Sequence, residues 1–316
     1  IMKILLLFEP EGYWKENLDK LKLQFPQVTF AVNSEPAGRI AELKTADAVV
    51  CGRLSAEELE GSSQLKAVIV PFTGLNNFPV EEIRKRSIAL YNTHANAPYV
   101  AEHAIALALA LLGRVNEFHN DLKQGVWNRT KKDQDMWTTL RGKRCGIMGY
   151  GNIGKCLASY LKPFDCKTTG FRRNITQTED DSGVDLTNSL DELFQKSEVI
   201  FNLLPLSPET KHIINPQNIA KLKGKYIISV GRGETIHEET LYNALKDNSV
   251  SGAALDVWYK YPGRDNNPVM PANFPFWELP NVVMSPHKSS HTTEAVIAMI
   301  DDTCNNIKNF INSAGA

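Results

Sequence analysis

A glycine-rich turn near the middle of the chain constrains the fold more than any other segment. It has the sequence Gly149-Tyr150-Gly151-Asn152-Ile153-Gly154. The apolar run 144–148 before it predicts a strand, and the periodic apolar pattern 153–161 after it predicts a helix. In this context the glycines allow a tight turn, close approach of the backbone to a pyrophosphate, and packing of helix on strand, while the helix N-terminus offers free N–H groups to phosphate. We therefore predict a dinucleotide-binding unit here.

Composition and charge exclude several other classes of protein. The 316 residues are 42% hydrophobic, which is enough for two domains with separate cores. Lys and Arg total 35 against 36 for Asp and Glu, and no block of like charge indicates a nucleic-acid or membrane-surface partner. The five cysteines are scattered and lack metal-ligand spacing, so we expect no metal site and reduced thiols in a cytoplasmic protein.

Short apolar runs alternate with helical patterns along the chain, which predicts an α/β fold with parallel sheets. In the first part we expect strands at 3–8, 48–50 and 67–70, and helices at 13–23 and 55–59. In the second part we expect strands near 143–148, 166–171, 199–203, 226–230, 252–257 and 282–285, and a last amphipathic helix at 293–311. We interpret this as one unit inserted into another: a cofactor-binding domain at 97–289, and a substrate domain at 1–96 plus 290–316.

The segment 100–112 is almost wholly Ala, Leu and Ile, apart from Glu102 and His103. A helix that is apolar on every face is typically buried all round. We therefore expect this helix to lie in a domain junction or a subunit interface.

Seven motifs follow one another along the chain: Pro71-Phe72-Thr73-Gly74-Leu75-Asn76, Asn96-Ala97 with Val100-Ala101-Glu102-His103, the glycine turn, Leu204-Pro205-Leu206-Ser207-Pro208-Glu209-Thr210, Val230-Gly231-Arg232-Gly233, Ala254-Leu255-Asp256-Val257 and Ser285-Pro286-His287. In this order they resemble the D-isomer-specific 2-hydroxyacid dehydrogenase family, which also holds formate, phosphite and phosphoglycerate dehydrogenases. The resemblance covers nearly the whole chain. It implies a Rossmann-type doubly wound parallel sheet inserted into a smaller flavodoxin-like α/β substrate domain, a cleft between the two domains, and a homodimer with the helix near Val100 in the interface.

Two residues of these motifs suit hydride transfer between a nicotinamide and a 2-keto acid. The guanidinium of Arg232 can bind carboxylate and carbonyl oxygens in a planar fork, and it follows an expected strand at the edge of the sheet where α/β sites lie. The imidazole of His287 titrates near neutrality, so it suits a general acid that protonates the new alkoxide.

The chain departs from the family pattern where a Glu normally pairs with this His. The corresponding position is Tyr261, and the run 257–264 contains no carboxylate. A carboxylate raises the pKa of a neighbouring imidazole, so its loss predicts a lower pKa for His287. Two interpretations stay open: the Tyr261 hydroxyl holds a ring nitrogen of His287, or Tyr261 packs elsewhere and Asp265 or Glu278 takes over.

A second departure concerns the choice of cofactor. NAD-preferring members of the family end the second cofactor strand in an acidic residue, whereas this strand ends in Arg172 and Arg173. Guanidinium groups attract a 2′-phosphate, which a carboxylate would repel. We therefore expect NADP to be favoured over NAD.

The resemblance implies further contacts, residue by residue. For the substrate these are Thr73, Gly74, Leu75 and Asn96, together with Arg232 and His287. For the cofactor they are Gly149, Gly151, Asn152, Ile153, Gly154, Leu204, Pro205, Thr210, Val230, Gly231, Arg232, Asp256, His287 and Ser289. Asp256 is expected to hydrogen-bond the carboxamide, with Ser289 near it.

Taken together, these residues predict an NADP-preferring reductase of a small 2-keto acid, of glyoxylate or hydroxypyruvate type, that forms the D-2-hydroxy acid. Because Tyr261 replaces the usual Glu, two alternatives remain: formate-dehydrogenase-like oxidation, and a cofactor-binding sensor with little turnover. The long segment 259–277 is expected to cover the cleft as a lid.

Overall fold

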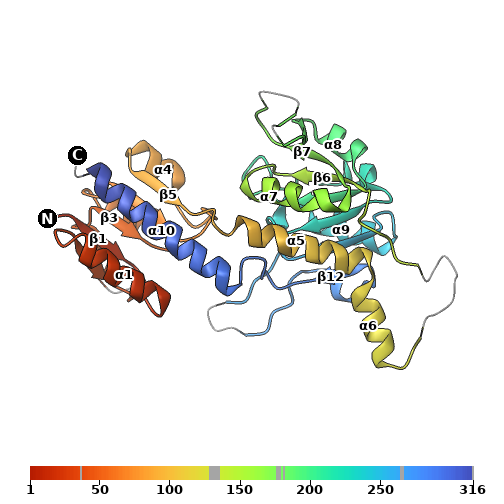
Figure 1. The fold of residues 1–316 in the computed structure, drawn as a ribbon, viewed down its shortest axis with the longest axis horizontal. Helices are drawn as coiled ribbons and strands as arrows, with labels where there is room; N and C mark the ends of the chain where they lie inside the picture. The colour runs from red at the N-terminus through yellow and green to blue at the C-terminus, as the bar shows by residue number, and fades with distance from the viewer. Residues whose placement is uncertain (36–37, 128–135, 176–178, 181, 264–266, 315–316) are drawn as a thin grey trace. The chain divides into compact units, whose positions relative to one another are not determined.

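The computed structural model describes residues 1–35, 38–127, 136–175, 179–180, 182–263 and 267–314. The chain divides into two compact units, drawn in Figure 1. Unit 1 comprises Ile1–Asn96 and His291–Ala316, and unit 2 comprises Ala97–Ser290. The last helix packs on elements of the first 96 residues, so unit 1 is built from both ends of the chain.

Unit 1 contains a five-stranded parallel sheet with the order β2-β1-β3-β4-β5. This is the flavodoxin-like order, as the resemblance predicted. The strands are β1 (Lys3–Leu6), β2 (Thr29–Val32), β3 (Ala48–Val50), β4 (Ala67–Val70) and β5 (Ala89–Asn92).

Helices cover both faces of this sheet, and each face has its own core. On β1, Ile4 and Leu6 point into the core beneath α1 and α10, while Leu5 points into the core on the opposite face. Because successive side chains of a strand alternate, a strand covered on both faces is apolar throughout. The helices are α1 (Tyr13–Gln24), α2 (Arg39–Leu43), α3 (Ala56–Glu60), α4 (Val80–Lys85) and α10 (Thr293–Ala314).

Unit 2 contains a seven-stranded parallel sheet with the order β12-β11-β10-β9-β6-β7-β8. The order reverses between β6 and β9, which makes the sheet doubly wound and places the binding crevice beyond the carboxyl ends of these strands. The strands are β6 (Arg144–Met148), β7 (Lys167–Phe171), β8 (Asp185–Thr187), β9 (Val199–Asn202), β10 (Tyr226–Ser229), β11 (Gly252–Leu255) and β12 (Val282–Met284).

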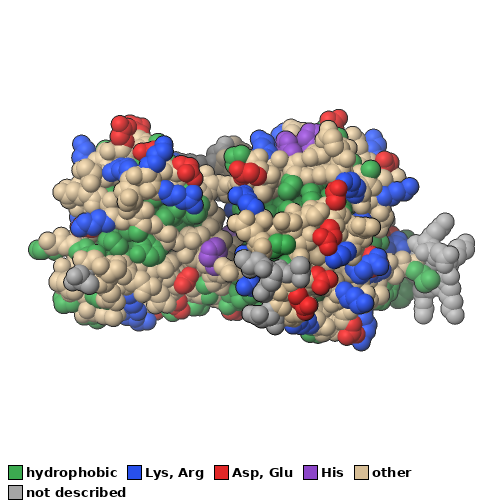
Figure 2. Space-filling model, turned by 90° about the horizontal axis from the view of Figure 1, so that it is seen from above, with side chains coloured by type: hydrophobic (Ala, Val, Ile, Leu, Met, Phe, Trp, Pro, Cys, Tyr) green, Lys and Arg blue, Asp and Glu red, His purple; other side chains and the backbone are tan. Residues whose placement is uncertain are grey.

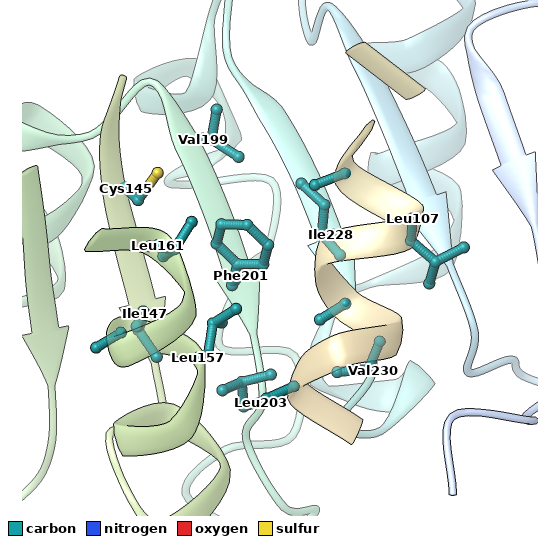
Figure 3. Close-up of a cluster of buried hydrophobic side chains, with 14 of the residues drawn as sticks. Leu107, Cys145, Ile147, Leu157, Leu161, Val199, Phe201, Leu203, Ile228 and Val230 are labelled. Carbon is teal, nitrogen blue, oxygen red and sulfur yellow. The ribbon is translucent and has the colours of Figure 1, made fainter. Parts of the chain in front are cut away.

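One face of this sheet is covered by α5 and α7, which lie side by side (Figure 1). Figure 3 shows the core beneath them, where Leu157 and Leu161 of α7 lie beside Phe201 of β9. The other face is covered mainly by α8 and α9. The helices are α5 (Ala97–Leu112), α6 (Val115–Lys123), α7 (Asn152–Leu161), α8 (Leu190–Lys196) and α9 (Glu238–Lys246), with short 3-10 turns η2 (Lys162–Phe164), η3 (Ile219–Leu222), η4 (Gly233–Thr235) and η5 (Phe276–Glu278).

The helix α5 buries one face and exposes the other. Glu102, Ala106 and Leu109 are exposed, so the expectation that this helix is buried all round is wrong for the single chain. Among the described residues, no single helix is long and apolar enough to span a bilayer, and α5 and α6 meet that length and composition only as a pair bent by 57°.

Charged side chains of both signs are interspersed on the surface. On the face that Figure 2 shows, Lys and Arg alternate with Asp and Glu over each unit, in keeping with the formal net charge of -1.

Candidate active site

The glycine turn follows β6 and begins α7, at the point where the strand order of unit 2 reverses. Gly149 has φ +94°, and a Cβ on it would lie 3.1 Å from the backbone carbon of Leu203. A Cβ on Gly154 would lie 3.0 Å from the Gly149 carbonyl oxygen, whereas a Cβ on Gly151 would meet nothing within 4 Å. The first and third glycines are therefore required by packing, and the second leaves open space at the N-terminus of α7.

The first N–H groups of α7 point out of that N-terminus without a protein acceptor. Lys155 N–H is the first of the helix to bond backward, to the Gly151 carbonyl oxygen at 2.9 Å. Within the described part of the chain, the N–H groups of Asn152 and Ile153 donate to no protein oxygen. Unpaired N–H groups beside open space fit a pyrophosphate, because the helix dipole also favours negative charge there.

Two neighbouring loops close against the glycine turn. A Cβ on Gly231, after β10, would lie 2.5 Å from the Leu204 carbonyl oxygen, so the loops after β9 and β10 touch backbone to backbone. The N–H groups of Val230 and Gly231 both donate to the Asn202 carbonyl oxygen, at 3.1 and 3.0 Å. The structure thus places Leu204, Val230 and Gly231 at the same sheet edge as the glycine turn.

The loop after β9 is a compact turn that continues from Leu204. The Thr210 hydroxyl donates to the Pro205 carbonyl oxygen at 2.6 Å and accepts the Ser207 N–H at 2.8 Å. Thr210 therefore shapes this turn, while the Pro205 side chain is exposed.

Arg172 and Arg173 directly follow β7, and both are exposed. The N–H of Arg172 donates to the Thr187 carbonyl oxygen at 3.1 Å, which holds the end of β7 beside β8. The Arg173 guanidinium lies 3.5 Å from the Glu209 carboxylate, and both side chains are more than 60% exposed. The two guanidinium groups thus stand at the carboxyl end of the second cofactor strand, where an adenine ribose would be bound in this fold.

The glycine turn also carries a buried aromatic side chain that the sequence analysis did not assign. The Tyr150 ring packs over Gly170, where a Cβ would lie 2.6 Å from a ring carbon. The Tyr150 hydroxyl donates to Asp180 Oδ2 at 2.6 Å, and burial, together with this carboxylate, raises the pKa of Tyr150 to about 12. A glycine inside β7, opposite an aromatic residue in the turn, is the signal that could have identified this contact.

Arg232 lies between β10 and the short turn η4. A Cβ on Gly233 would lie 2.3 Å from the Trp258 carbonyl oxygen, so η4 packs directly on the backbone that follows β11. One guanidinium nitrogen of Arg232 donates to the Gly231 carbonyl oxygen at 2.8 Å. Burial raises the pKa of Tyr261, and the nearby positive charge of Arg232 opposes this rise, so the two side chains lie in the same part of unit 2.

The loop after β12 holds His287 in a left-handed conformation, with φ +56°. The fully buried carboxylate of Asp256 fixes this loop: its Oδ1 accepts the Ser285 hydroxyl at 2.5 Å and the Lys288 N–H at 2.8 Å, and its Oδ2 accepts the Ser289 N–H at 3.0 Å. Two N–H groups that follow a left-handed residue and converge on one anion form a nest. Asp256 therefore shapes the loop that carries His287; its expected contact with a carboxamide stays a prediction.

Tyr261 lies against His287 through its ring. The ring centroids are 5.5 Å apart and the planes are tilted by 55°. The Tyr261 hydroxyl accepts the Trp258 N–H at 3.1 Å, and burial raises its pKa, so it remains neutral. Of the two alternative acids, Glu278 is exposed at the end of η5, and Asp265 lies outside the described residues.

In unit 1, the predicted substrate residues gather at the carboxyl ends of β4 and β5. Thr73 Oγ1 lies 2.8 Å from Asn96 Oδ1 and 2.9 Å from the Thr93 carbonyl oxygen. Within the described residues, the N–H groups of Gly74 and Leu75 donate to no protein oxygen. This edge therefore presents unpaired donors that suit a carboxylate.

The segment 259–277 is described except for residues 264–266, which lie outside the described part of the chain. Its second half is anchored on unit 2: Glu238, at the start of α9, accepts the N–H groups of Asn273 and Phe274, and Phe276 is fully buried. The residues around Phe276 are therefore part of the fold of unit 2, which does not fit a lid over this half of the segment.

No cluster of three or more His, Cys, Asp or Glu that could hold a metal ion occurs among the described residues.

Comparison with known proteins agrees with this geometry. Residues 105–289 match the model of the D-isomer specific 2-hydroxyacid dehydrogenase NAD binding domain. The chain is 31% identical to glyoxylate reductase from Thermofilum pendens over 279 residues (85% of this chain, 79% of that protein), and 34% identical to hydroxypyruvate reductase from Thermotoga maritima over 245 residues (77% and 76%). The NAD-dependent formate dehydrogenase from Staphylococcus aureus, solved in complex with NAD, has a TM-score of 0.75 and 26% identity (99% of this chain, 96% of that one). The chain therefore belongs to the D-isomer specific 2-hydroxyacid dehydrogenases, a family of nicotinamide-dependent oxidoreductases.

Proposed function

We propose that this protein reduces a small 2-keto acid to the D-2-hydroxy acid, with NADPH preferred over NADH. The observation that carries the proposal is the grouping of Arg232, Tyr261 and His287 at the carboxyl edge of the unit 2 sheet, the edge that also carries the glycine turn. The names of the glyoxylate and hydroxypyruvate reductases that the chain resembles support this substrate class.

Arg232 and His287 have separate tasks in the reduction. A bound nicotinamide supplies the hydride. Arg232 binds the substrate carboxylate and polarises the keto oxygen, which stabilises the negative charge that develops there. His287 donates a proton to that oxygen, so that an alcohol is formed and the imidazole is left neutral. In unit 1, the N–H groups of Gly74 and Leu75, which donate to no protein oxygen among the described residues, also suit a carboxylate.

The residues that would hold the cofactor divide into two groups. The N–H groups of Asn152 and Ile153 would bind the pyrophosphate, and Gly151 leaves the space for it. Arg172 and Arg173 would bind the 2′-phosphate of NADP. The ion pair of Arg173 with Glu209 is exposed and therefore weak, so it opposes phosphate binding only slightly.

We also propose a homodimer formed through the exposed side of α5 and α6. Large apolar side chains are exposed along α5, α6 and the described residues that follow them, and an interface would remove such side chains from water. They are Leu109, Val115, Leu122, Val126, Trp127, Met136 and Trp137.

The five free cysteines support a reducing, cytoplasmic location.

The test is NADPH oxidation by the purified protein against a panel of 2-keto acids that includes glyoxylate and hydroxypyruvate, with NADH in parallel. The proposal expects turnover with NADPH well above that with NADH. Cofactor binding without turnover on any 2-keto acid would contradict it and would favour a binding-only sensor.

A second candidate is formate oxidation. It is favoured by Tyr261, because oxidation of formate requires no proton removal from a hydroxyl and hence no carboxylate beside His287. The 26% identity to the Staphylococcus aureus formate dehydrogenase supports it. Reduction of NAD⁺ or NADP⁺ that depends on formate, measured in the same preparation, distinguishes this candidate from the first.

A further inference from the structure

A histidine on the apolar helix α5 reaches the loop that carries His287. His103 Nε2 lies 3.2 Å from the Ser285 hydroxyl oxygen and 3.8 Å from Asp256 Oδ1. Its side chain is 31% exposed, whereas Asp256 is fully buried. Polar residues are costly on the packed side of such a helix unless they have a partner there, so this contact calls for a functional explanation.

The direction of the hydrogen bonds follows from the number of hydrogens available. An ionised carboxylate can only accept, so the single hydrogen of the Ser285 hydroxyl points to Asp256 Oδ1 at 2.5 Å. The Ser285 oxygen can then only accept from His103. The imidazole of His103 must therefore carry a hydrogen on Nε2, and the bonds run from His103 through Ser285 to Asp256.

This chain of bonds ends on the groups that hold His287. Asp256 also accepts the N–H groups of Lys288 and Ser289, which flank His287 on its C-terminal side, and the Trp258 indole N–H donates to the Ser285 carbonyl oxygen at 2.8 Å. A left-handed backbone at a non-glycine residue is unfavourable and persists only where its surroundings fix it. His103 is the contact that links α5 to this arrangement.

We propose that His103 is a positioning residue for the reduction: as an Nε2–H donor to Ser285, it orients the Asp256 carboxylate and thereby the loop that presents His287. The inference rests on the proposed role of His287 as the proton donor. It adds a residue from a different element, 184 positions earlier in the chain, to the control of that role.

The activity test uses two substitutions at position 103 in the full-length protein. His103→Leu removes the donor, whereas the side-chain amide of His103→Gln offers an N–H at a similar reach. We expect His103→Leu to lower kcat about tenfold with little change in the KM for NADPH, and His103→Gln to recover most of it. Equal losses in the Leu and Gln variants would overturn the proposal.

A double-mutant cycle tests whether His103 acts through its hydrogen bond to Ser285 or through the packing of α5 in general. If His103 acts through Ser285, the losses in kcat of His103→Leu and Ser285→Ala are strongly non-additive, since either change breaks the same path. Additive losses would overturn the proposal. Thermal unfolding of each variant identifies any that fails to fold, and the tautomer measurement on the wild type uses His103→Gln only to assign the nitrogen signals.

The tautomer can be measured directly and without substrate. In protein labelled with [15N]histidine, at a pH where the imidazole is neutral, the nitrogen shifts of His103 are assigned by their absence in His103→Gln. The proposal requires hydrogen on Nε2, and a bare Nε2 would overturn it. Because this measurement needs no turnover, failure of the proposed reductase activity and failure of this inference give different results.

Discussion

Two loops of unit 2 are built in opposite ways, although both follow parallel strands of one sheet. In the loop after β6, Gly151 faces open space, and the N–H groups that follow it donate to no protein oxygen among the described residues. In the loop after β12, the polar groups already have protein partners: Asp256 accepts three hydrogen bonds from this loop, and the Trp258 indole N–H donates a fourth to the Ser285 carbonyl oxygen. The first loop leaves room for an anion that binds from outside the protein. The second loop is already bound to an anion of the protein, the Asp256 carboxylate after β11, which fixes the loop that carries His287.

This difference predicts that a substitution in one loop impairs the function of that loop and leaves the function of the other largely intact. Asp256→Ala would leave the buried Ser285 hydroxyl and Ser289 N–H, and the part-buried Lys288 N–H, without their acceptor, and we expect it to lower the free energy of unfolding by about 3–5 kcal/mol and kcat by at least ~100-fold. The glycine turn is untouched, so in the folded variant the dissociation constant for NADPH should rise by no more than the loss of the predicted carboxamide contact accounts for, about tenfold or less. Urea unfolding and a fluorescence titration check both parts, and parallel loss of NADPH binding would show that the loops are not independent.

Within the nucleotide-binding part, two glycines provide a matched pair. Gly231→Ala places a Cβ 2.5 Å from a backbone oxygen, so we expect a loss of about 2–3 kcal/mol in the free energy of unfolding. Gly151→Ala meets nothing within 4 Å, so its stability should stay within about 0.5 kcal/mol of the wild type. Because the new methyl group occupies the space proposed for the pyrophosphate, NADPH should bind about 10-fold or more weakly. Wild-type affinity in Gly151→Ala would place the pyrophosphate elsewhere.

The next smaller predicted effect is on the preference for NADPH over NADH. Arg172→Ala removes one of two guanidiniums proposed to bind the 2′-phosphate, and we expect the KM for NADPH to rise about tenfold while that for NADH changes little. Glu209→Gln, which removes only the exposed partner of Arg173, should lower the KM for NADPH by no more than about twofold. An equal change for both cofactors in Arg172→Ala would argue against a 2′-phosphate site at this residue.

The smallest predicted effect concerns the neighbour of His287. The Tyr261 hydroxyl is uncharged near neutral pH, and partial burial raises its pKa further, so it supplies no charge to the imidazole. A carboxylate in Tyr261→Glu would stabilise the imidazolium and raise the pKa of His287, and reduction requires the protonated form. The alkaline limb of the pH profile of kcat/KM should therefore move upward by about one unit. Tyr261→Gln is the uncharged control, and an unmoved profile in Tyr261→Glu would contradict this account.

The same contrast explains which parts of the molecule could be predicted from sequence. The glycine turn is a local pattern, so its strand, helix and open N-terminus were all visible in one short segment. Strands β2, β5 and β8 were missed, and each is an edge strand. An edge strand is only partly covered, as the residues of β5 illustrate, and it lacks the continuous apolar run that identifies a central strand such as β4.

The loop after β12 could be predicted only in part. His287 and Asp256 were identified as candidates from their motifs, but the sequence analysis assigned Asp256 to a cofactor contact. Its hydrogen bonds to Ser285, Lys288 and Ser289, and the approach of His103, depend on how three distant segments pack together. The polar pair Glu102-His103 within an otherwise apolar helix was the available signal.

The most direct test of the central claim is a crystal structure of this protein with NADPH and oxamate, an unreactive analogue of a 2-keto acid. The account predicts pyrophosphate oxygens within hydrogen-bonding distance of the N–H groups of Asn152 and Ile153, the 2′-phosphate on Arg172, and the oxamate carboxylate on Arg232. A pyrophosphate bound away from the start of α7, or an oxamate that does not contact Arg232, would contradict it.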